Sequence, residues 1–364
     1  MRSLTRLLIN MKEIKRKPIA VLITDVHLDK NNTALVEDIF SQLLAVCREK
    51  HVYNIICAGD VFTSRSGQPL ECLSSWQKIL KMSKGVEIIA IPGNHDKTDA
   101  NDERSYLDIY DRNEKFFRLC RVGETVFIED VRFDFIPYFG RERWEEELGK
   151  LKKLNNKDVN ILVTHMGFNG VRNNDGTEVT DSIPPSAVSE YDLVLVGHYH
   201  NRSKVGKNIF YTGSAYQNNY GENCTDKGFT VIYDDASVEF VSSKFPRYIK
   251  ETIQATDRET LANLLEKYGT EEREDHVRFE FVGKKADLET LDVTDIENRY
   301  GIDCKFVSVE EKEAIEGAVG EDVLNYDSAS ITKNFYRFCT ENNIRGAELK
   351  YGVGLMKILK CGLQ

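Results

Sequence analysis

The chain has 364 residues, of which 41% are hydrophobic and 30% are charged, and its formal net charge is −10 at pH 7. This composition is that of a soluble globular protein, and no apolar run is long enough to cross a bilayer, so we expect no membrane partner. Much of the acidity follows residue 256, so the net charge alone does not exclude a nucleic-acid partner.

The first part of the chain alternates apolar runs with amphipathic segments. The apolar, β-branched runs at 19–24, 53–58 and 86–91 predict buried strands. Helical spacing of apolar residues predicts helices at 33–50 and 69–82. This alternation predicts a parallel sheet with right-handed crossovers between its strands.

After residue 100 the pattern changes to a second, mostly β region. Helices are predicted at 103–117 and 141–154. Strands are predicted at 119–138, 159–163, 192–196 and 208–241. The β alternation of this region predicts a second sheet.

Composition divides the chain into four segments. These are a basic leader expected to be disordered (1–17), a main domain (18–245), a small α/β domain (246–310) and a helical C-terminal segment (311–364). Within the small domain the predicted order is strand 247–254, helix 257–268, strand 276–282, helix 287–299 and strand 302–309. The eight cysteines form no CxxC pair, which indicates a reducing, cytoplasmic compartment and no zinc finger.

Polar side chains with metal-binding chemistry follow five of the predicted strands. They are Asp25 and His27, Asp60, Asn94 and His95, His165, and His198 and His200. Carboxylate, amide and imidazole groups are ligands of divalent transition metals, and the carboxyl ends of parallel strands form the ligand sites of α/β sheets. Taken singly, each residue has a structural explanation, such as a helix cap or a turn. The repetition at five strand ends, which uses five of the seven histidines, favours a metal site.

These strand ends resemble the signature of the calcineurin-like metallophosphoesterases, which is DxH, GDxx, GNHD, an isolated His and GHxH. The chain carries DVH (25–27), GDVF (59–62), GNHD (93–96), THMG (164–167) and GHYH (197–200). The resemblance implies an α/β sandwich of two mixed sheets flanked by helices, with a small α/β cap domain and C-terminal helices.

The same resemblance implies two metal ions, which we expect to be Mn²⁺, with other divalent transition metals as alternatives. One ion would be held by Asp25, His27, Asp60 and His200, and the other by Asp60, Asn94, His165 and His198. Asp60 is suited to bridging because a carboxylate has two oxygens, whereas a neutral imidazole offers one lone pair. His95 is expected to stabilise charge on the phosphoryl group and to protonate the departing oxygen. Asp96 is expected to act in catalysis by orienting His95, or else to be a helix N-cap.

Finer motifs resemble the SbcD-type DNA-repair exonucleases and their phage-encoded relatives. They are GDVFTSR (59–65), FIPYFGR (135–141), YTGSAYQNNYGE (211–222) and KGF (227–229). The resemblance implies a Mn²⁺-dependent nuclease of the 3′–5′ exonuclease and endonuclease type, acting on double-stranded DNA ends and single strands in repair, recombination or replication. It also implies a homodimer formed through 69–82 and 103–117, and an SbcC-like coiled-coil ATPase as partner. The apolar stripe at 326–359 suits docking of that ATPase or, equally, an ordinary core face. The protein would then act near the nucleoid or in the cytoplasm of a phage-infected cell.

Four basic residues are candidates for contacts with the DNA backbone, although each also suits a solvated surface: Arg65, Arg141, Lys204 and Lys207. Two other functions remain open. One is a phosphoesterase for small phosphoesters or phosphoproteins, and the other is a non-catalytic scaffold with the same fold. A scaffold has no need of His95, and a small-substrate enzyme has no need of a cap and docking helices.

Overall fold

The computed structural model of the chain describes residues 16–111, 116–151, 153–154, 158–172, 177–222, 226–269 and 273–309. The chain divides into two units, residues 1–249 with 274–276, and residues 250–273 with 277–364. The predictions for residues 1–15 of the leader and for the C-terminal segment 311–364 lie outside the described residues. Lys17, the last residue of the predicted leader, forms an ion pair of 2.6 Å with Glu129 of the main unit. The domain boundaries drawn from the sequence remain predictions.

The first sheet of the main unit has the strand order β12-β11-β1-β2-β3-β4. Its strands are β1 (Pro18–Ile23), β2 (Asn54–Ala58), β3 (Glu87–Ile91), β4 (Phe117–Leu119), β11 (Gly228–Tyr233) and β12 (Val238–Ser242). Strands β1 to β4 are parallel, as the sequence predicts for the first three, while β11 pairs antiparallel with both β1 and β12. The crossovers contain α1 (Thr33–Lys50) and α2 (Leu70–Met82), at the predicted positions.

The second sheet has the strand order β5-β6-β7-β8-β10-β9. Its strands are β5 (Glu124–Ile128), β6 (Val131–Ile136), β7 (Asn160–Thr164), β8 (Leu193–Val196), β9 (Ser203–Val205) and β10 (Ile209–Tyr211). Strands β6, β7, β8 and β10 are parallel, and β5 and β9 pair antiparallel at the two edges. The helix α4 (Arg141–Lys150) and the short 3₁₀ helix η1 (Pro185–Val188) accompany this sheet.

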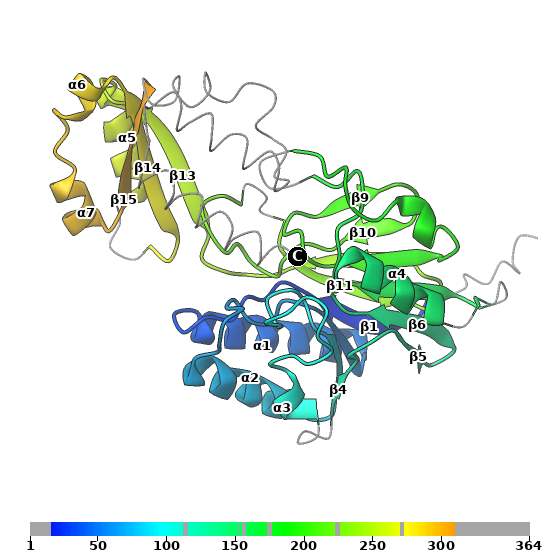
Figure 1. Cartoon of the computed structure of the whole chain (residues 1–364). Helices are drawn as coiled ribbons and strands as arrows, with labels where there is room; N and C mark the ends of the chain where they lie inside the picture. Colours follow the sequence, from blue (N-terminus) through cyan, green and yellow to red (C-terminus); the bar gives the residue numbers. More distant parts are fainter. Residues whose placement is uncertain are drawn as a thin grey trace, which may run out of the picture. The chain divides into compact units, whose positions relative to one another are not determined.

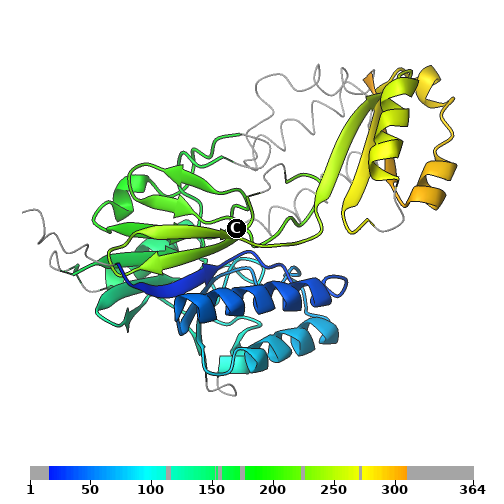
Figure 2. The same ribbon diagram turned by 180° about the vertical axis from the view of Figure 1, so that it is seen from behind.

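The two sheets pack face to face between layers of helix (Figure 1). One hydrophobic cluster lies between the first sheet and the helices α1 and α2, which run side by side (Figure 2), and it contains Phe40 and Trp76. A second cluster, with Ile56 and Phe133, joins the two sheets. A third, with Trp144, fills the space between the second sheet and α4. Each parallel strand is therefore covered on both faces, which explains its continuous apolar sequence. The structure confirms the predicted sandwich of two mixed sheets flanked by helices.

The prediction of a helix at 103–117 is wrong. Of the residues that the structure describes in this range, 103–111 and 116–117, only the turn α3 (Asp108–Asp111) is helical, and β4 begins at Phe117. The side chains of Asp102 and Asp108 accept hydrogen bonds from the backbone amides of Arg104 (2.9 Å) and Ser105 (2.6 Å). Such local bonds compete with helix formation. The second of the two helices that we expected to form a dimer interface is therefore reduced to one turn in the described residues.

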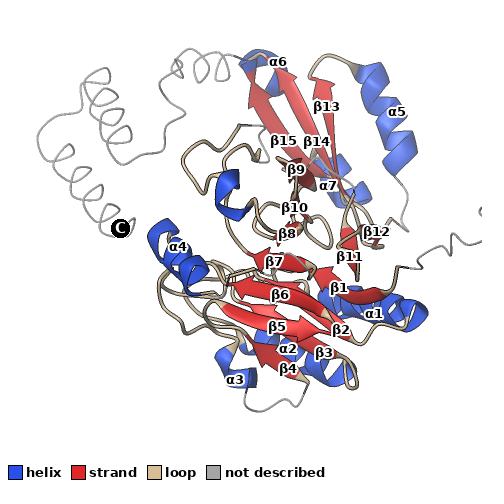
Figure 3. Ribbon diagram, turned by 90° about the vertical axis from the view of Figure 1, so that its right-hand side faces the viewer, coloured by secondary structure: helices blue, strands red, loops and turns tan. Residues whose placement is uncertain are grey.

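The second unit contains most of a three-stranded sheet of order β13-β14-β15 (Figure 3). Its elements are β13 (Tyr248–Gln254), α5 (Arg258–Tyr268), β14 (His276–Gly283), α6 (Lys285–Leu288), α7 (Thr294–Tyr300) and β15 (Asp303–Ser308). The single helix predicted at 287–299 is instead two, α6 and α7, and between them the carboxylate of Asp292 accepts a local hydrogen bond from the backbone amide of Thr294 at 3.0 Å. Within the residues that the structure describes, no helix is long and apolar enough to cross a membrane.

Candidate metal centre

The candidate ligands meet at one rim of the main unit, formed by the C-terminal ends of β1, β2 and β3 of the first sheet and of β7 and β8 of the second. Backbone hydrogen bonds fix the loops that leave these strands. The amide of Asp25 donates to the carbonyl of Gly59 at 3.1 Å, and the amide of Gly197 donates to that of Thr164 at 3.1 Å. All seven predicted ligands lie in this cluster, as expected from their positions after parallel strands.

Four of these ligands have left-handed backbone conformations. The φ angles are 52° at Asp25, 47° at His27, 53° at Asp60 and 87° at His198. Conformations of this kind cost about 1–3 kcal/mol each in non-glycine residues and are concentrated at functional sites. The backbone therefore holds these side chains in place before any metal ion binds.

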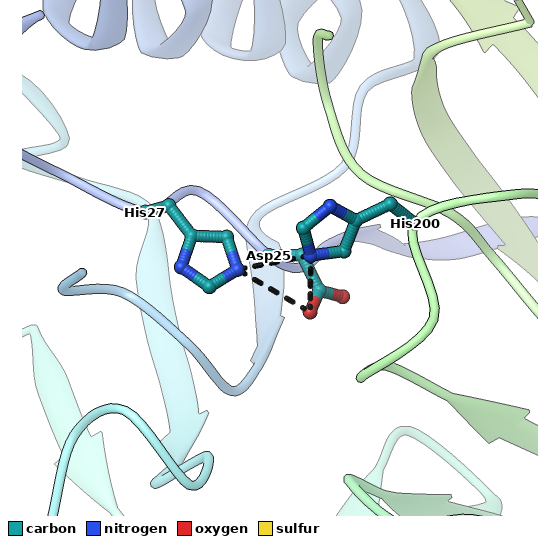
Figure 4. Close-up of side chains that lie close together, drawn as sticks. All are labelled: Asp25, His27 and His200. Atoms are coloured by element: carbon teal, nitrogen blue, oxygen red, sulfur yellow. Dashed lines mark hydrogen bonds and ion pairs between the residues drawn. The ribbon is translucent and has the colours of Figure 1, made fainter. Parts of the chain in front are cut away.

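The first group of ligands is Asp25, His27 and His200 (Figure 4). The Nε2 atoms of the two imidazoles lie 3.0 Å apart. The Asp25 Oδ1 atom lies 3.7 Å from Nε2 of His200 and 4.0 Å from Nε2 of His27. One carboxylate oxygen and two ring nitrogens thus converge on one point, as in the first predicted ligand set.

The second group is Asp60, His165 and His198, to which Asn94 adds an amide oxygen. The Asp60 Oδ2 atom lies 3.3 Å from Nε2 of His165. The Asn94 Oδ1 atom lies 3.2 Å from the same nitrogen and 2.9 Å from Nδ1 of His198. Asp60 Oδ2 also lies 3.7 Å from Nε2 of His27, so this carboxylate stands between the two groups.

Neighbouring acceptors fix which ring nitrogen of two histidines faces the cluster. Nδ1 of His165 lies 2.7 Å from the carbonyl oxygen of Ala58, and Nδ1 of His200 lies 2.8 Å from a carboxylate oxygen of Glu222. Because a carbonyl or carboxylate oxygen only accepts, each Nδ1 carries the proton. Nε2 of both rings then faces the cluster, where a metal ion would take the place of any proton on it, as in other metal-bound histidines.

Charge within the cluster is consistent with cation binding. Burial lowers the pKa of His27 and of His198 to about 4, so both rings are neutral near pH 7. Burial would raise the pKa of Asp60, but the adjacent His165 outweighs it and holds that pKa well below its usual range. Burial likewise opposes protonation of His165, but Asp60 raises its pKa to about 9. The positive charge of protonated His165 thus compensates the negative charge of Asp60, as a bound cation would. Ionised carboxylates, a neutral amide and imidazole lone pairs form a donor set that fits divalent transition metals.

His95 is half-buried at the edge of the cluster. Its ring packs edge-on against that of His27, with centroids 4.9 Å apart. Its Nδ1 lies 2.5 Å from the carbonyl oxygen of Thr63, which requires a proton on Nδ1 and leaves Nε2 for another partner. Its backbone amide donates to Oδ1 of Asp60 at 2.8 Å, so the position of His95 is tied to that of a ligand.

Asp96 is fully buried behind this edge and joins two of the loops. Its carboxylate accepts hydrogen bonds from the backbone amides of Gly93 and Phe62, both at 2.9 Å, and from that of Val61 at 3.3 Å. No helix begins directly after Asp96, since the described residues 97–107 contain none, so the N-cap interpretation is wrong. No hydrogen bond recorded for the described residues joins its carboxylate to His95, and the catalytic role expected for Asp96 remains a prediction.

A cleft of about 820 Å³ opens on to the cluster, and it is lined by candidate ligands together with His95 and Arg65. Of the four predicted DNA-backbone contacts, only Arg65 lines this cleft. Arg141 forms ion pairs with Glu145 and Asp181. Lys204 and Lys207 lie on and beside the edge strand β9. The structure therefore brings one of the four basic residues to the site.

Sequence reasoning missed two residues that support the cluster. Glu222 holds the ring of His200, and Lys227 forms an ion pair of 2.6 Å with Glu222. Burial opposes ionisation of Glu222, but His200 and Lys227 lower its pKa to about 2. Glu222 ends the SbcD-like motif YTGSAYQNNYGE and Lys227 begins the motif KGF, but only the folded structure shows that both side chains are buried.

We expect Gly93→Ala to displace Asp60. A Cβ atom on Gly93 would lie 2.2 Å from Oδ1 of Asp60 and 2.3 Å from its backbone nitrogen. Overpacking of this kind typically costs about 1–3 kcal/mol, so both the urea midpoint and the affinity for Mn²⁺ should fall. Gly67→Ala is the control, because nothing lies within 4 Å of its Cβ position. Parent-like Mn²⁺ binding by the Gly93→Ala variant would contradict this account.

Comparison with known proteins gives the following matches. The family model described as "Calcineurin-like phosphoesterase" matches residues 20–202. A "Putative phosphoesterase 244L" of Invertebrate iridescent virus 6 is 22% identical over 253 residues, which cover 66% of this chain and 84% of the viral protein.

Two archaeal relatives carry the name "DNA double-strand break repair protein Mre11". That of Sulfurisphaera tokodaii is 28% identical over 50% of this chain and 48% of its own length. That of Saccharolobus solfataricus is 29% identical over 50% of this chain and 49% of its own length. The match thus spans about half the length of these two relatives.

Proposed function

This chain belongs to the calcineurin-like phosphoesterase family, whose model matches residues 20–202, and we propose that within this family it is a Mn²⁺-dependent nuclease that hydrolyses phosphodiester bonds at DNA ends. Members of this family are metal-dependent hydrolases of phosphoesters. The observation that carries the proposal is the cluster of seven donors at one rim, with Asp60 between its two groups and His95 at its edge.

Two divalent cations held by these donors would activate water and withdraw charge from the phosphate. Asp25 and Asp60 supply the negative charge that binds them, and the neutral rings of His27 and His198 supply lone pairs. His95 directs Nε2 away from Thr63, where it can stabilise charge on the phosphoryl oxygens and protonate the departing oxygen. Arg65, in the wall of the same cleft, would attract the phosphate backbone without reading sequence.

Two further observations favour DNA as the substrate. The chain carries SbcD-like motifs among and after its metal motifs, and two of the relatives are named as DNA double-strand break repair proteins. We further propose a cytoplasmic homodimer that works with an SbcC-like coiled-coil ATPase in DNA repair, recombination or replication. Of the two segments expected to form the dimer interface, α2 is the one that is a long helix in the described residues.

The proposal is tested by incubating the Mn²⁺-loaded full chain with linear duplex DNA, single-stranded DNA, bis(p-nitrophenyl) phosphate and p-nitrophenyl phosphate. We expect degradation of DNA from its ends and hydrolysis of the diester, both abolished by chelator. Turnover of the monoester with intact DNA would favour a phosphatase for small phosphoesters or phosphoproteins. DNA binding without hydrolysis of any of the four would favour a scaffold.

A further inference from the structure

A fully buried pair of opposite charges lies directly behind His200. The side chains of Glu222 and Lys227 are both 0% exposed, and their charged atoms lie 2.6 Å apart. Burying two charges is expensive, and replacing such a pair with apolar side chains is often neutral or stabilising for folding. Stability alone therefore gives no reason for a charged pair at this place.

The pair holds His200 at two points. A carboxylate oxygen of Glu222 accepts the hydrogen on Nδ1 of His200 at 2.8 Å. The ammonium group of Lys227 donates to the backbone carbonyl of His200 at 2.7 Å, to the Ser214 hydroxyl at 2.9 Å and to Glu222 at 2.6 Å. An ammonium group has three hydrogens, so every donor of Lys227 has a partner. The side chain and the backbone of His200 are thus fixed by one connected network.

The segment that carries Glu222 is itself anchored. The Gln217 side chain donates to the backbone carbonyl of Glu222 at 2.9 Å, and the backbone amide of Asn218 donates to the Glu222 carboxylate at 3.2 Å. The carboxylate therefore has little freedom to turn away from His200. With its Nδ1 hydrogen fixed in this way, His200 presents Nε2 toward Asp25 and His27.

We propose that Glu222 is a positioning residue that fixes the tautomer and direction of the His200 ring for metal binding, and that Lys227 keeps Glu222 and the His200 backbone in place. This inference rests on the proposed function, in which His200 holds a metal ion. Partners of metal-bound histidines typically contribute about 10–100-fold to metal affinity or activity.

The decisive variant is the double substitution Glu222→Leu with Lys227→Met, which removes both charges and leaves neither ion alone. We expect it to fold with a urea midpoint near that of the parent but to bind Mn²⁺ at one of two sites about 10–100-fold more weakly in calorimetry. The matched control is Asp134→Leu with Arg132→Met, which removes another buried ion pair, of 2.9 Å, in strand β6. This control should keep parent-like Mn²⁺ affinity.

A second measurement is made on the parent protein and needs a variant only to assign the signal. In the parent protein labelled with ¹⁵N-histidine and loaded with Zn²⁺, the His200 ring should carry a slowly exchanging proton on Nδ1, assigned by its absence from His200→Asn. An unprotonated Nδ1 would overturn the inference, as would parent-like Mn²⁺ binding by the Glu222→Leu, Lys227→Met variant. Failure of the parent itself to bind Mn²⁺ would instead contradict the proposed function.

Discussion

Asp60→Asn is expected to reduce Mn²⁺-dependent hydrolysis by more than about 100-fold, which exceeds the usual effect of residues that only support a metal ligand. Asp60 belongs to two of the three groups of potential ligands, and its Oδ2 lies within 3.7 Å of both His165 and His27. Asparagine keeps the shape and tolerates the left-handed φ of 53°, but it removes the charge that both cations would share. Turnover of bis(p-nitrophenyl) phosphate and of linear DNA, together with the stoichiometry of Mn²⁺ binding, measures the effect.

Glu147→Gln is the control for this substitution. Glu147 is also a buried carboxylate, paired with Arg143 and Lys150 at 2.8 and 2.7 Å on α4, and it belongs to none of the three ligand groups. This variant should lose some stability and keep both metal binding and turnover. An Asp60→Asn variant that digests DNA like the parent would show that Asp60 does not bridge two ions.

His95→Ala is expected to lower kcat by about 10²–10⁴-fold, the range for loss of a general acid or base, while Mn²⁺ affinity stays within a few-fold of the parent. The reason is that Nδ1 of His95 is engaged by the Thr63 carbonyl at 2.5 Å, so the ring presents only Nε2 to the cleft. Calorimetry with Mn²⁺ and turnover of the diester on the same preparation separate binding from chemistry.

A different outcome for His95→Ala would reassign this residue. His95 also forms a potential ligand group with His27 and Asp60, and a large loss of Mn²⁺ affinity would make it a ligand. His51→Asn is the control, because His51 lies at the C-terminus of α1, at the opposite rim from the cluster, and asparagine tolerates its φ of 55°. It should behave as the parent in both assays.

That the candidate ligands lie together could be predicted from the sequence because the signal is local. Each ligand follows directly after a buried strand, and glycine at the turn lets the loops approach closely, as where a Cβ on Gly197 would meet Oγ1 of Thr24 at 2.3 Å. Parallel strands then bring these ends to one rim without further information. For this reason the sequence pattern alone predicts that the candidate ligands lie close together, although they come from two sheets.

Two features could not be predicted from the sequence pattern: the loss of helix at 103–117, which depends on local polar hydrogen bonds, and the burial of Glu222 and Lys227, which depends on contacts with distant residues. The segment around Asp102 and Asp108 has helical spacing, but these side chains bond to the backbone amides of Arg104 and Ser105, and residues 103–107 are not helical. Glu222 and Lys227 lie in a turn-rich stretch where charges are usually solvated. Their burial depends on His200 and Ser214, which no local pattern connects to them.

The division of the ligands between two sheets has a consequence for the nascent chain on the ribosome. Asp25, Asp60 and Asn94 are synthesised long before His198, and β11, which pairs with β1 in the middle of the first sheet, follows later still. At about 5–20 residues per second, translation from Asn94 to the end of β11 takes on the order of ten seconds. Until residue 200 has been added, the emerging polypeptide has the carboxylates of Asp25 and Asp60 but still lacks imidazoles of the cluster. The complete donor set is therefore present only after most of the main unit has been synthesised.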